Sequence, residues 1–237
     1  MYGHDAAELY DLLHAERGKD FAAEARFVRR LIAERNPTAS TLLDIACGTG
    51  AHLEHLAGSF DRVAGLELSE SMLAMAKAKM PEVELHHGDM RTLSLGDTFD
   101  AVICLFGSIG YVDSVDELHT TVRRFAEHTS KGGVVVLEPW WQPDTFTPGH
   151  ISGDVITVDN RTIARVSHAS RLPDASHMQV HYVVAEPEGG IRHFTEEHIC
   201  KLFPRQEYER ALEGAGLRVE YFACGLSGKG LYVGTRR

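Results

Sequence analysis

A short apolar strand that runs directly into a glycine-containing turn constrains the fold of this chain most. Residues 41–46 read as the strand, and Ala46, Gly48 and Gly50 are the small residues of the turn. The apolar spacing over residues 51–58 predicts a helix immediately afterwards. Strand, Gly-x-Gly turn and helix, in this order, bring backbone N–H groups to a ligand at the carboxyl edge of an open α/β sheet. Small residues keep Cβ atoms out of the way of that ligand.

The surroundings of the turn indicate which ligand it serves. A dinucleotide fingerprint has a third glycine where Leu53 stands. The pattern Asp-x-Ala-Cys-Gly-x-Gly at residues 44–50 instead resembles motif I of the methyltransferases that use S-adenosylmethionine (SAM). Glu67 closes a second apolar strand 17 residues after Gly50, where a carboxylate can accept hydrogen bonds from both ribose hydroxyls of an adenosine.

A third predicted strand, residues 82–86, leads into Gly88-Asp89-Met90. There the Asp89 side chain is expected to bind the adenine amino group while Met90 packs against the ring. The glycine turn, the acidic strand end and Gly-Asp-Met together predict a SAM site. An ordinary α/β domain with polar strand ends is the alternative.

Composition narrows the class of protein. The 237 residues suit one α/β domain with an insertion, and the net charge of −10 opposes loose nucleic-acid binding, which depends on a basic surface. It leaves a small anionic substrate possible. No apolar run reaches the length of a membrane span and no signal peptide opens the sequence, so we expect no membrane partner. The four cysteines are scattered, which predicts reduced thiols in a cytoplasmic protein, with Cys47 as a small packing residue.

The order of elements predicts a doubly wound, Rossmann-like parallel sheet with an inserted antiparallel layer. Two helices are expected at 5–16 and 18–35. Alternating strands and helices follow at 41–46, 51–58, 62–68, 70–79, 82–86, 99–105, 114–128 and 133–138. Period-two alternation then predicts antiparallel strands at 152–158, 161–171, 176–186 and 190–202. A helix at 204–215 and strands at 217–223 and 229–235 would complete a seven-stranded sheet with an antiparallel edge. The predicted core is therefore 1–139 and 203–237, and the predicted insertion is 140–202, contributing to the substrate site or a dimer contact.

Over nearly its full length the chain resembles the N,N-dimethyltransferases that act on TDP-3-amino-deoxysugars in macrolide-type antibiotic pathways, the desosamine and mycaminose enzymes. The segments that carry the resemblance are Glu8–Leu12, Gly18–Asp20, Leu43–Gly50, Gly65–Ser69, His87–Arg91, Gly132–Val136, Glu138–Trp141, Arg165–His168 and Ser227–Leu231. The first glycine motif is general to the superfamily, whereas the double tryptophan and the segments after it are far more specific.

The resemblance implies a class I methyltransferase that uses SAM and a TDP-amino-deoxysugar. With the turn glycines, the implied cofactor residues are Tyr10, Ala46, Gly48, Gly50, Glu67, Leu68, Asp89, Met90 and Leu105. The implied substrate residues are Tyr2, Phe21, Trp141, Arg171 and Lys229. Three positions depart from some relatives: Phe21 stands where Tyr is common, Tyr111 where some carry His, and Lys229 where Arg is usual. The last change replaces a bidentate fork by a point charge.

Methyl transfer from a sulfonium to an amine is a direct displacement, so holding the reactants in line can supply most of the acceleration. An amino-sugar nitrogen titrating near ~8, like an α-amino group, has a useful neutral fraction at neutral pH. We therefore expect no indispensable general base, and Tyr111 orients the amine or relays its proton to water.

Three alternatives stay open at this point. The chain could be a small-molecule methyltransferase acting on oxygen or on another amino position, or a SAM-binding protein without transfer activity. A homodimer formed through the antiparallel layer is a further possibility. A metal site is not expected at the histidines of the later strands, because no carboxylate or cysteine recurs around them with ligand spacing. These are His168, His177, His181, His193 and His198, and surface or phosphate-side positions are expected for them.

Overall fold

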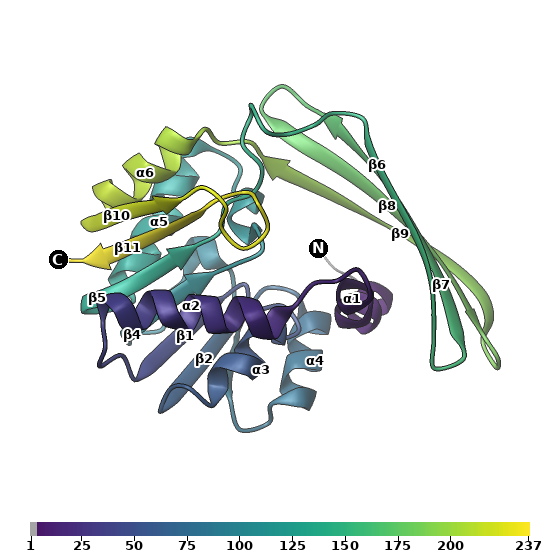
Figure 1. Cartoon of the computed structure of the whole chain (residues 1–237), viewed down its shortest axis with the longest axis horizontal. Helices are drawn as coiled ribbons and strands as arrows, with labels where there is room; N and C mark the ends of the chain where they lie inside the picture. Colours follow the sequence, from purple (N-terminus) through teal and green to yellow (C-terminus); the bar gives the residue numbers. More distant parts are fainter. Residues whose placement is uncertain (1–3) are drawn as a thin grey trace.

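The computed structural model describes residues 4–237 and contains two separate β-sheets (Figure 1). The helices are α1 (His4–Glu16), α2 (Phe21–Arg35), α3 (Ala51–Ala57), α4 (Glu70–Lys79), α5 (Val115–Glu127) and α6 (Arg205–Gly214), with short 3-10 helices η1 (Met90–Thr92) and η2 (Ser108–Tyr111). The strands are β1 (Thr41–Ile45), β2 (Arg62–Glu67), β3 (Glu84–His87), β4 (Phe99–Cys104), β5 (Thr129–Leu137), β6 (His150–Val158), β7 (Arg161–Arg171), β8 (Ala175–Glu186), β9 (Gly190–Lys201), β10 (Leu217–Phe222) and β11 (Leu231–Arg236).

The larger sheet has the order β10-β11-β5-β4-β1-β2-β3, which confirms the predicted seven-stranded Rossmann-like core. Strands β1 to β5 pair in parallel, and β11 runs antiparallel to both of its neighbours. The antiparallel strand therefore lies one position in from the edge, rather than at the edge itself. Because all the parallel strands end on one side, their carboxyl ends form a single edge at which a ligand can be bound.

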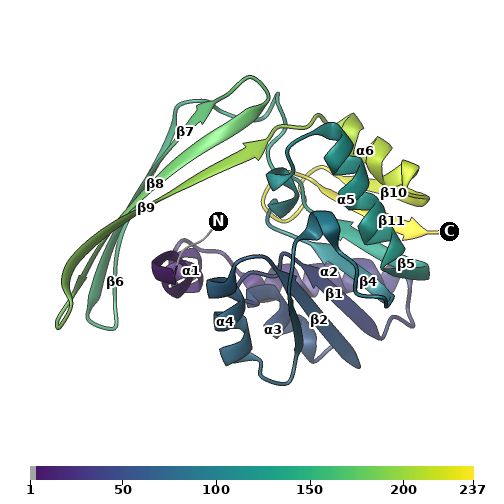
Figure 2. The same ribbon diagram turned by 180° about the vertical axis from the view of Figure 1, so that it is seen from behind.

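Helices cover both faces of this sheet (Figures 1 and 2). Helices α5 and α6 pack on one face and α2, α3 and α4 on the other, each burying its own apolar cluster against the strands. Strands buried on both faces are expected to be apolar throughout, and Val134–Leu137 of β5 is fully buried.

Helix α2 begins three residues later than the sequence pattern suggests. The Asp20 carboxylate accepts a hydrogen bond from Ala23 N at 2.7 Å, so Asp20 is the N-cap of the helix. Gly18, with φ of 83°, makes the turn that separates α1 from this cap.

The smaller sheet holds the four predicted antiparallel strands in the order β6-β7-β8-β9. Its inner face packs on α1, which lies between this sheet and the core in Figure 1. The residues of this contact are Leu9 and Leu13 of α1 with Ile163, Val180, Tyr182 and Val184. The smaller sheet therefore shares its apolar contact with a helix from the start of the chain. The division into a core and an insertion at residues 140–202 stays a prediction.

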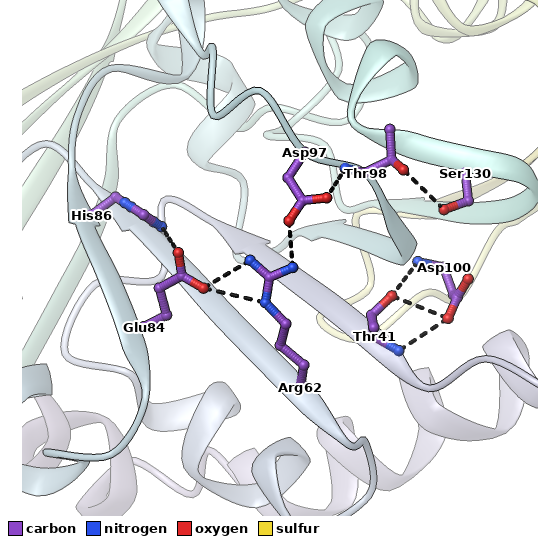
Figure 3. Close-up of polar contacts among 8 residues, drawn as sticks. All are labelled: Thr41, Arg62, Glu84, His86, Asp97, Thr98, Asp100 and Ser130. Atoms are coloured by element: carbon purple, nitrogen blue, oxygen red, sulfur yellow. Dashed lines mark hydrogen bonds and ion pairs between the residues drawn. The ribbon is translucent and has the colours of Figure 1, made fainter.

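Charged side chains close the amino ends of the parallel strands (Figure 3). Arg62, at the start of β2, donates to Glu84 at 2.8 Å and also binds Asp97. The Asp100 carboxylate accepts hydrogen bonds from Thr41 N at 3.1 Å and from Thr41 Oγ1 at 3.0 Å. Each of these charges is thus matched by a neighbouring strand or loop.

Within residues 4–237, no helix has both the length and the apolar character needed to cross a membrane.

Candidate active site

The turn after β1 is built from residues in the left-handed backbone region. Ala46, Gly48 and Gly50 have φ values of 57°, 59° and 77°. The φ of Gly50 is one that residues with a side chain rarely adopt, so the turn favours glycine there for its conformation. Ala46 is strained in this conformation, and such strain often occurs where backbone approaches a ligand.

Glu67, at the end of β2, binds this turn from the neighbouring strand. Its Oε2 accepts a hydrogen bond from Gly48 N at 2.9 Å, and its Oε1 accepts one from Ser69 N at 2.7 Å. The carboxylate is therefore held at the carboxyl edge by backbone donors on two sides. This places it where the sequence predicts a partner for ribose hydroxyls.

Asp89, at the end of β3, is held by a neighbour rather than left open. Arg91 Nε donates to Asp89 Oδ2 at 2.9 Å, and this bonding with Arg91 is the main cause that lowers the pKa of Asp89. The adjoining Met90 is buried, as expected of an apolar wall beside an aromatic base. Leu68 is partly exposed, and its carbonyl lies 2.9 Å from His87 Nε2.

A small pocket, partly open to solvent, lies at the ends of β1 and β4. Of the predicted residues it brings together Tyr10, Ala46, Gly48, Leu105 and Phe21. Its remaining walls are Asp44, Cys47, Thr49, Ala51, His52, Phe106 and Ser108. The sequence assigned Phe21 to the sugar side, and the structure places its ring 5.0 Å from the ring of His52, in the wall of this pocket.

Asp44 gives the pocket a buried carboxyl group. Burial, and secondarily the nearby Glu67 carboxylate, raises the pKa of Asp44 well above its usual range. A cation bound in the pocket would stabilise the charged form of this carboxyl group, so the pocket suits a ligand that carries positive charge. Cys47 is also buried, and burial raises the pKa of its thiol, consistent with a packing role and not a nucleophilic one.

Helix α1 is tied to the turn through a shared carboxylate. Asp11 accepts hydrogen bonds from the Thr49 hydroxyl and from the Lys79 ammonium. Tyr10 stands one residue away, with its ring edge-on to Phe106 at 6.4 Å between centroids. This helix therefore forms one side of the pocket.

Phe106 connects the pocket to a second, more basic region. Its φ of 58° is strained for a bulky residue, and its N–H donates to the buried Glu138 carboxylate at 2.6 Å. The Glu138 carboxylate also accepts a hydrogen bond from Ser227. Two ammonium groups lie over the ring of Phe106, Lys19 Nζ at 3.9 Å and Lys229 Nζ at 5.3 Å from its centroid.

Lys229 is enclosed by aromatic rings. Its Nζ lies 4.6 Å from the ring centroid of Trp140 and 5.6 Å from that of Trp141. Burial lowers the pKa of Lys229, and the nearby Glu138 opposes this shift. Within residues 4–237 no carboxylate forms an ion pair with this half-buried ammonium, which suits an anionic substrate group.

The other predicted substrate residues lie in different settings. Arg171 is exposed and donates to the Pro143 carbonyl at 2.8 Å. Tyr2 lies outside the described residues.

Tyr111, at the end of η2, contacts the antiparallel sheet. Its hydroxyl lies 2.8 Å from Nδ1 of His198 on β9. The sequence predicts His198 at the surface or beside phosphate. The surface position is wrong, because His198 is 3% exposed and faces inward. Within residues 4–237, no group of three or more potential metal-ligating residues is found.

Several pocket residues were missed by the sequence reasoning. His52 bonds Glu24 at 2.7 Å, and Glu24 also accepts from Lys19 at 2.7 Å, so α2, α3 and the loop before α2 are joined by one charged group. Phe106 has no motif of its own, and its position immediately after the fourth strand was the one available signal.

Comparison with known proteins places this site in a family. A methyltransferase-domain model matches residues 42–133. The dTDP-3-amino-3,4,6-trideoxy-alpha-D-glucopyranose N,N-dimethyltransferase of Streptomyces venezuelae is 53% identical over 235 residues, 99% of each chain. The chain belongs to the dTDP-amino-deoxysugar N,N-dimethyltransferases.

Two further relatives are named for other amino sugars. The dTDP-4-amino-2,3,4,6-tetradeoxy-D-glucose N,N-dimethyltransferase of Saccharopolyspora spinosa is 47% identical, covering 100% of this chain and 94% of its own. The structure of SAM-bound CalS10, an amino pentose methyltransferase from Micromonospora echinaspora involved in calicheamicin biosynthesis, superposes with a TM-score of 0.89 at 42% identity, covering 97% of both chains.

The cofactor of these dimethyltransferases is SAM, and the pocket suits it. Backbone N–H groups, a strand-end carboxylate and the buried Asp44 meet around a turn in which Gly48 and Gly50 have positive φ values. When bound, SAM supplies an electrophilic methyl group on a positively charged sulfur.

Proposed function

We propose that this protein transfers two methyl groups to the amino nitrogen at position 3 of a TDP-linked amino-deoxysugar. The full-length similarity to the Streptomyces venezuelae dimethyltransferase, which its name assigns to a 3-amino sugar, carries this proposal. A 4-amino sugar is the second candidate, because the Saccharopolyspora spinosa relative is named for one.

In this proposal the pocket at the ends of β1 and β4 binds SAM. Glu67 would bind the ribose, and Asp89 and Met90 would bind the adenine. Tyr10 and Leu105 would form the remaining walls of the pocket. Glu67 is already fixed by two backbone donors, so its carboxylate is positioned before the ligand arrives. Fixing both reactants in this way lets proximity supply most of the acceleration.

The sugar nucleotide would lie beside this pocket, under the antiparallel sheet. Lys229 would bind the pyrophosphate, Trp141 would stack on an apolar face of the substrate, and Arg171 would contribute from the rim. The burial of Lys229 beside Phe106, and the 2.8 Å hydrogen bond that fixes Trp140 to Ser176 of β8, support this placement.

A panel of TDP-amino sugars, assayed by mass, tests the proposal. A gain of two CH2 groups on a 3-amino substrate supports it, and a gain of one implies single transfer. Preference for the 4-amino substrate would favour the second candidate. Modification of a hydroxyl in place of the amine, or SAM binding without turnover on any amine, would contradict both.

Replacing Lys229 tests the nucleotide end of the site. Lys229→Met is expected to raise KM for the sugar nucleotide about 10- to 100-fold, because a charge-assisted contact to phosphate is lost, while SAM affinity stays unchanged. Lys201→Met is the matched control, because Lys201, at the end of β9, pairs with the exposed Asp174 in the turn between β7 and β8. Equal KM values for the two variants would contradict the assignment.

We further propose association as a homodimer through the outer face of the smaller sheet. That face exposes apolar side chains on all four strands, namely Ile151, Val155, Val166, Val183, Ile191 and Ile199. Light scattering on the purified protein would measure the mass. The expected cytoplasmic location and the expected lack of nucleic-acid and membrane partners stay predictions.

A further inference from the structure

The inner face of β9 carries a line of polar side chains toward the core. Alternate residues of a strand share a face, so Glu196, His198 and Cys200 point the same way. All three are buried, with Glu196 at 8% and His198 at 3% exposure. The proposed function gives no role to the first two.

Glu196 is an unusual residue for this position. Within residues 4–237, neither of its carboxylate oxygens has a hydrogen-bond partner, and its near contact is His198 Nε2 at 3.6 Å. Burying a carboxylate without hydrogen-bond donors is costly, so a residue of this kind is a candidate for function.

His198 connects this carboxylate to Tyr111. Its Nδ1 lies 2.8 Å from the Tyr111 hydroxyl, while its Nε2 faces Glu196. A carboxylate beside Nε2 favours the tautomer with the proton on that nitrogen. Nδ1 is then an acceptor, and the Tyr111 hydroxyl donates to it.

Tyr111 links this buried pair to the segment that borders the pocket. The residue is 38% exposed, and it ends the 3-10 helix that begins at Ser108, a pocket residue. Its hydroxyl is also within hydrogen-bonding reach of the Cys200 thiol, and the charge of Lys229 acts on that thiol. Tyr111, His198 and Glu196 therefore form a chain of neighbouring polar groups that runs from the segment after β4 into the smaller sheet.

Double methylation of one nitrogen creates a proton problem that such a path can solve. In the first transfer the neutral amine nitrogen bonds the methyl carbon, while the carbon–sulfur bond of SAM breaks and its electron pair stays on sulfur. The nitrogen becomes a secondary ammonium, and it must lose one proton before it can attack a second methyl group.

We propose that Tyr111, His198 and Glu196 carry this proton away from the reacting nitrogen between the two transfers. The inference rests on the proposed function. The ammonium gives its proton to the Tyr111 oxygen as the Tyr111 hydroxyl proton moves to Nδ1 of His198. The resulting imidazolium is stabilised by the Glu196 carboxylate, and it returns the proton to water when the site opens. Tyr111 is the catalytic residue of this step, and His198 and Glu196 are positioning residues that act through it.

The other ionisable groups around the path lie on β7, β8 and β9. Arg165 on β7 donates to Ser167 at 3.1 Å, and the charges of Arg165 and Glu196 act in opposite directions on the pKa of Tyr182 on β8. Burial raises the pKa of Tyr182 and raises that of Cys200 to about 12, so neither titrates near neutral pH. The pH dependence of the path is therefore expected to follow the substrate amine.

The test measures the two methyl transfers separately. Glu196→Gln keeps the volume of the side chain but removes the charge that stabilises the imidazolium. The holoenzyme with SAM and its TDP-amino sugar is quenched at intervals, and monomethyl and dimethyl products are resolved by mass. At neutral pH the second transfer is expected to slow about 10- to 100-fold and monomethyl product to accumulate, with the first transfer little changed. The defect should shrink toward pH ~9, above the amine pKa of ~8, where water alone deprotonates the ammonium.

Glu197→Gln is the matched control. Glu197 is the next residue on β9 but faces outward, pairing with His177 at 3.4 Å, so this variant should keep the wild-type product ratio. Tyr111→Phe, which changes a half-exposed hydroxyl, should reproduce the Glu196→Gln profile even if the buried variant folds poorly.

The outcomes separate the two levels of the proposal. A wild-type enzyme that methylates no amino sugar refutes the proposed function, and the path with it. If the wild type dimethylates but Glu196→Gln and Tyr111→Phe keep its product ratio at all pH values, only the path is refuted. Equal slowing of both transfers at every pH would also overturn it, because that result indicates a structural role.

Discussion

The two ends of the parallel sheet differ in how they treat charge. At the amino ends, Arg62 is matched by Glu84 and Asp97 near the surface (Figure 3). At the carboxyl ends, Asp44 is buried and Lys229 is half-buried, and removal from water shifts the pKa of each in the direction that favours its neutral form. At the amino ends the charged side chains pair with one another. At the carboxyl ends the charged groups are removed from water and can bind a ligand.

The backbone shows the same difference. The non-glycine residues Ala46 and Phe106, which follow β1 and β4, have positive φ values at the carboxyl end. Strain and desolvation of this kind cost stability and are retained where they serve binding. We therefore expect the ligand-binding edge, which a few buried contacts hold in shape, to be less stable than the opposite edge.

The largest effect should come from Glu138, the buried carboxylate that fixes the strained Phe106. Glu138→Ala leaves Phe106 N–H and the Ser227 hydroxyl unpaired, so we expect a loss of about 2–4 kcal/mol in the free energy of unfolding. Urea denaturation measures it. Glu84→Ala at the opposite end should cost less than about 1 kcal/mol, because Glu84 is a solvent-screened partner. Equal losses would remove the distinction between the two ends.

A gain of stability is expected at Asp44. A carboxyl group whose folded-state pKa is raised destabilises the protein as pH rises above the unfolded-state value. Asp44→Asn should therefore stabilise the ligand-free protein at pH ~7 by about 0.5–2 kcal/mol. The gain should shrink as the pH falls toward ~4 and vanish below pH ~3, under the unfolded-state pKa of ~3.9, where Asp44 is protonated in both states. Thermal denaturation across this pH range measures it, and a loss of stability at neutral pH would contradict the account.

The smallest effect is expected at Arg62. Its side chain is 40% exposed, so Arg62→Ala should lower the free energy of unfolding by less than about 1 kcal/mol despite two ion pairs. The loss should shrink further as salt screens the pairs. A large loss that is insensitive to salt, measured by the same urea denaturation, would mean that the amino end is also a buried electrostatic centre.

The sequence predicted the parts of the site that belong to local patterns. The turn around Gly48, and Glu67 at the next strand end, follow from strand and turn rules, because parallel strands end at one edge. Phe106 and Glu138 could not be predicted as a pair, since 32 positions separate them and their contact depends on the packing of β4 beside β5.

His198 shows the same limit in the smaller sheet. Period-two alternation predicts its strand, but which face turns inward depends on how that sheet leans over α1 and η2. The pattern alone therefore predicted a surface or phosphate-side position for His198. The contact with Tyr111 depends on the packing of the smaller sheet against η2, which the pattern does not contain.

Binding of SAM tests the central claim most directly, because every proposal here requires a cofactor pocket at the carboxyl edge. Calorimetric titration should show one site in the wild-type protein. Glu67→Gln should weaken binding about 10- to 100-fold through the loss of a charged acceptor, while Glu84→Gln at the other end should bind like the wild type. No heat of binding to the wild type, or equal affinity of the Glu67→Gln variant, would contradict the account.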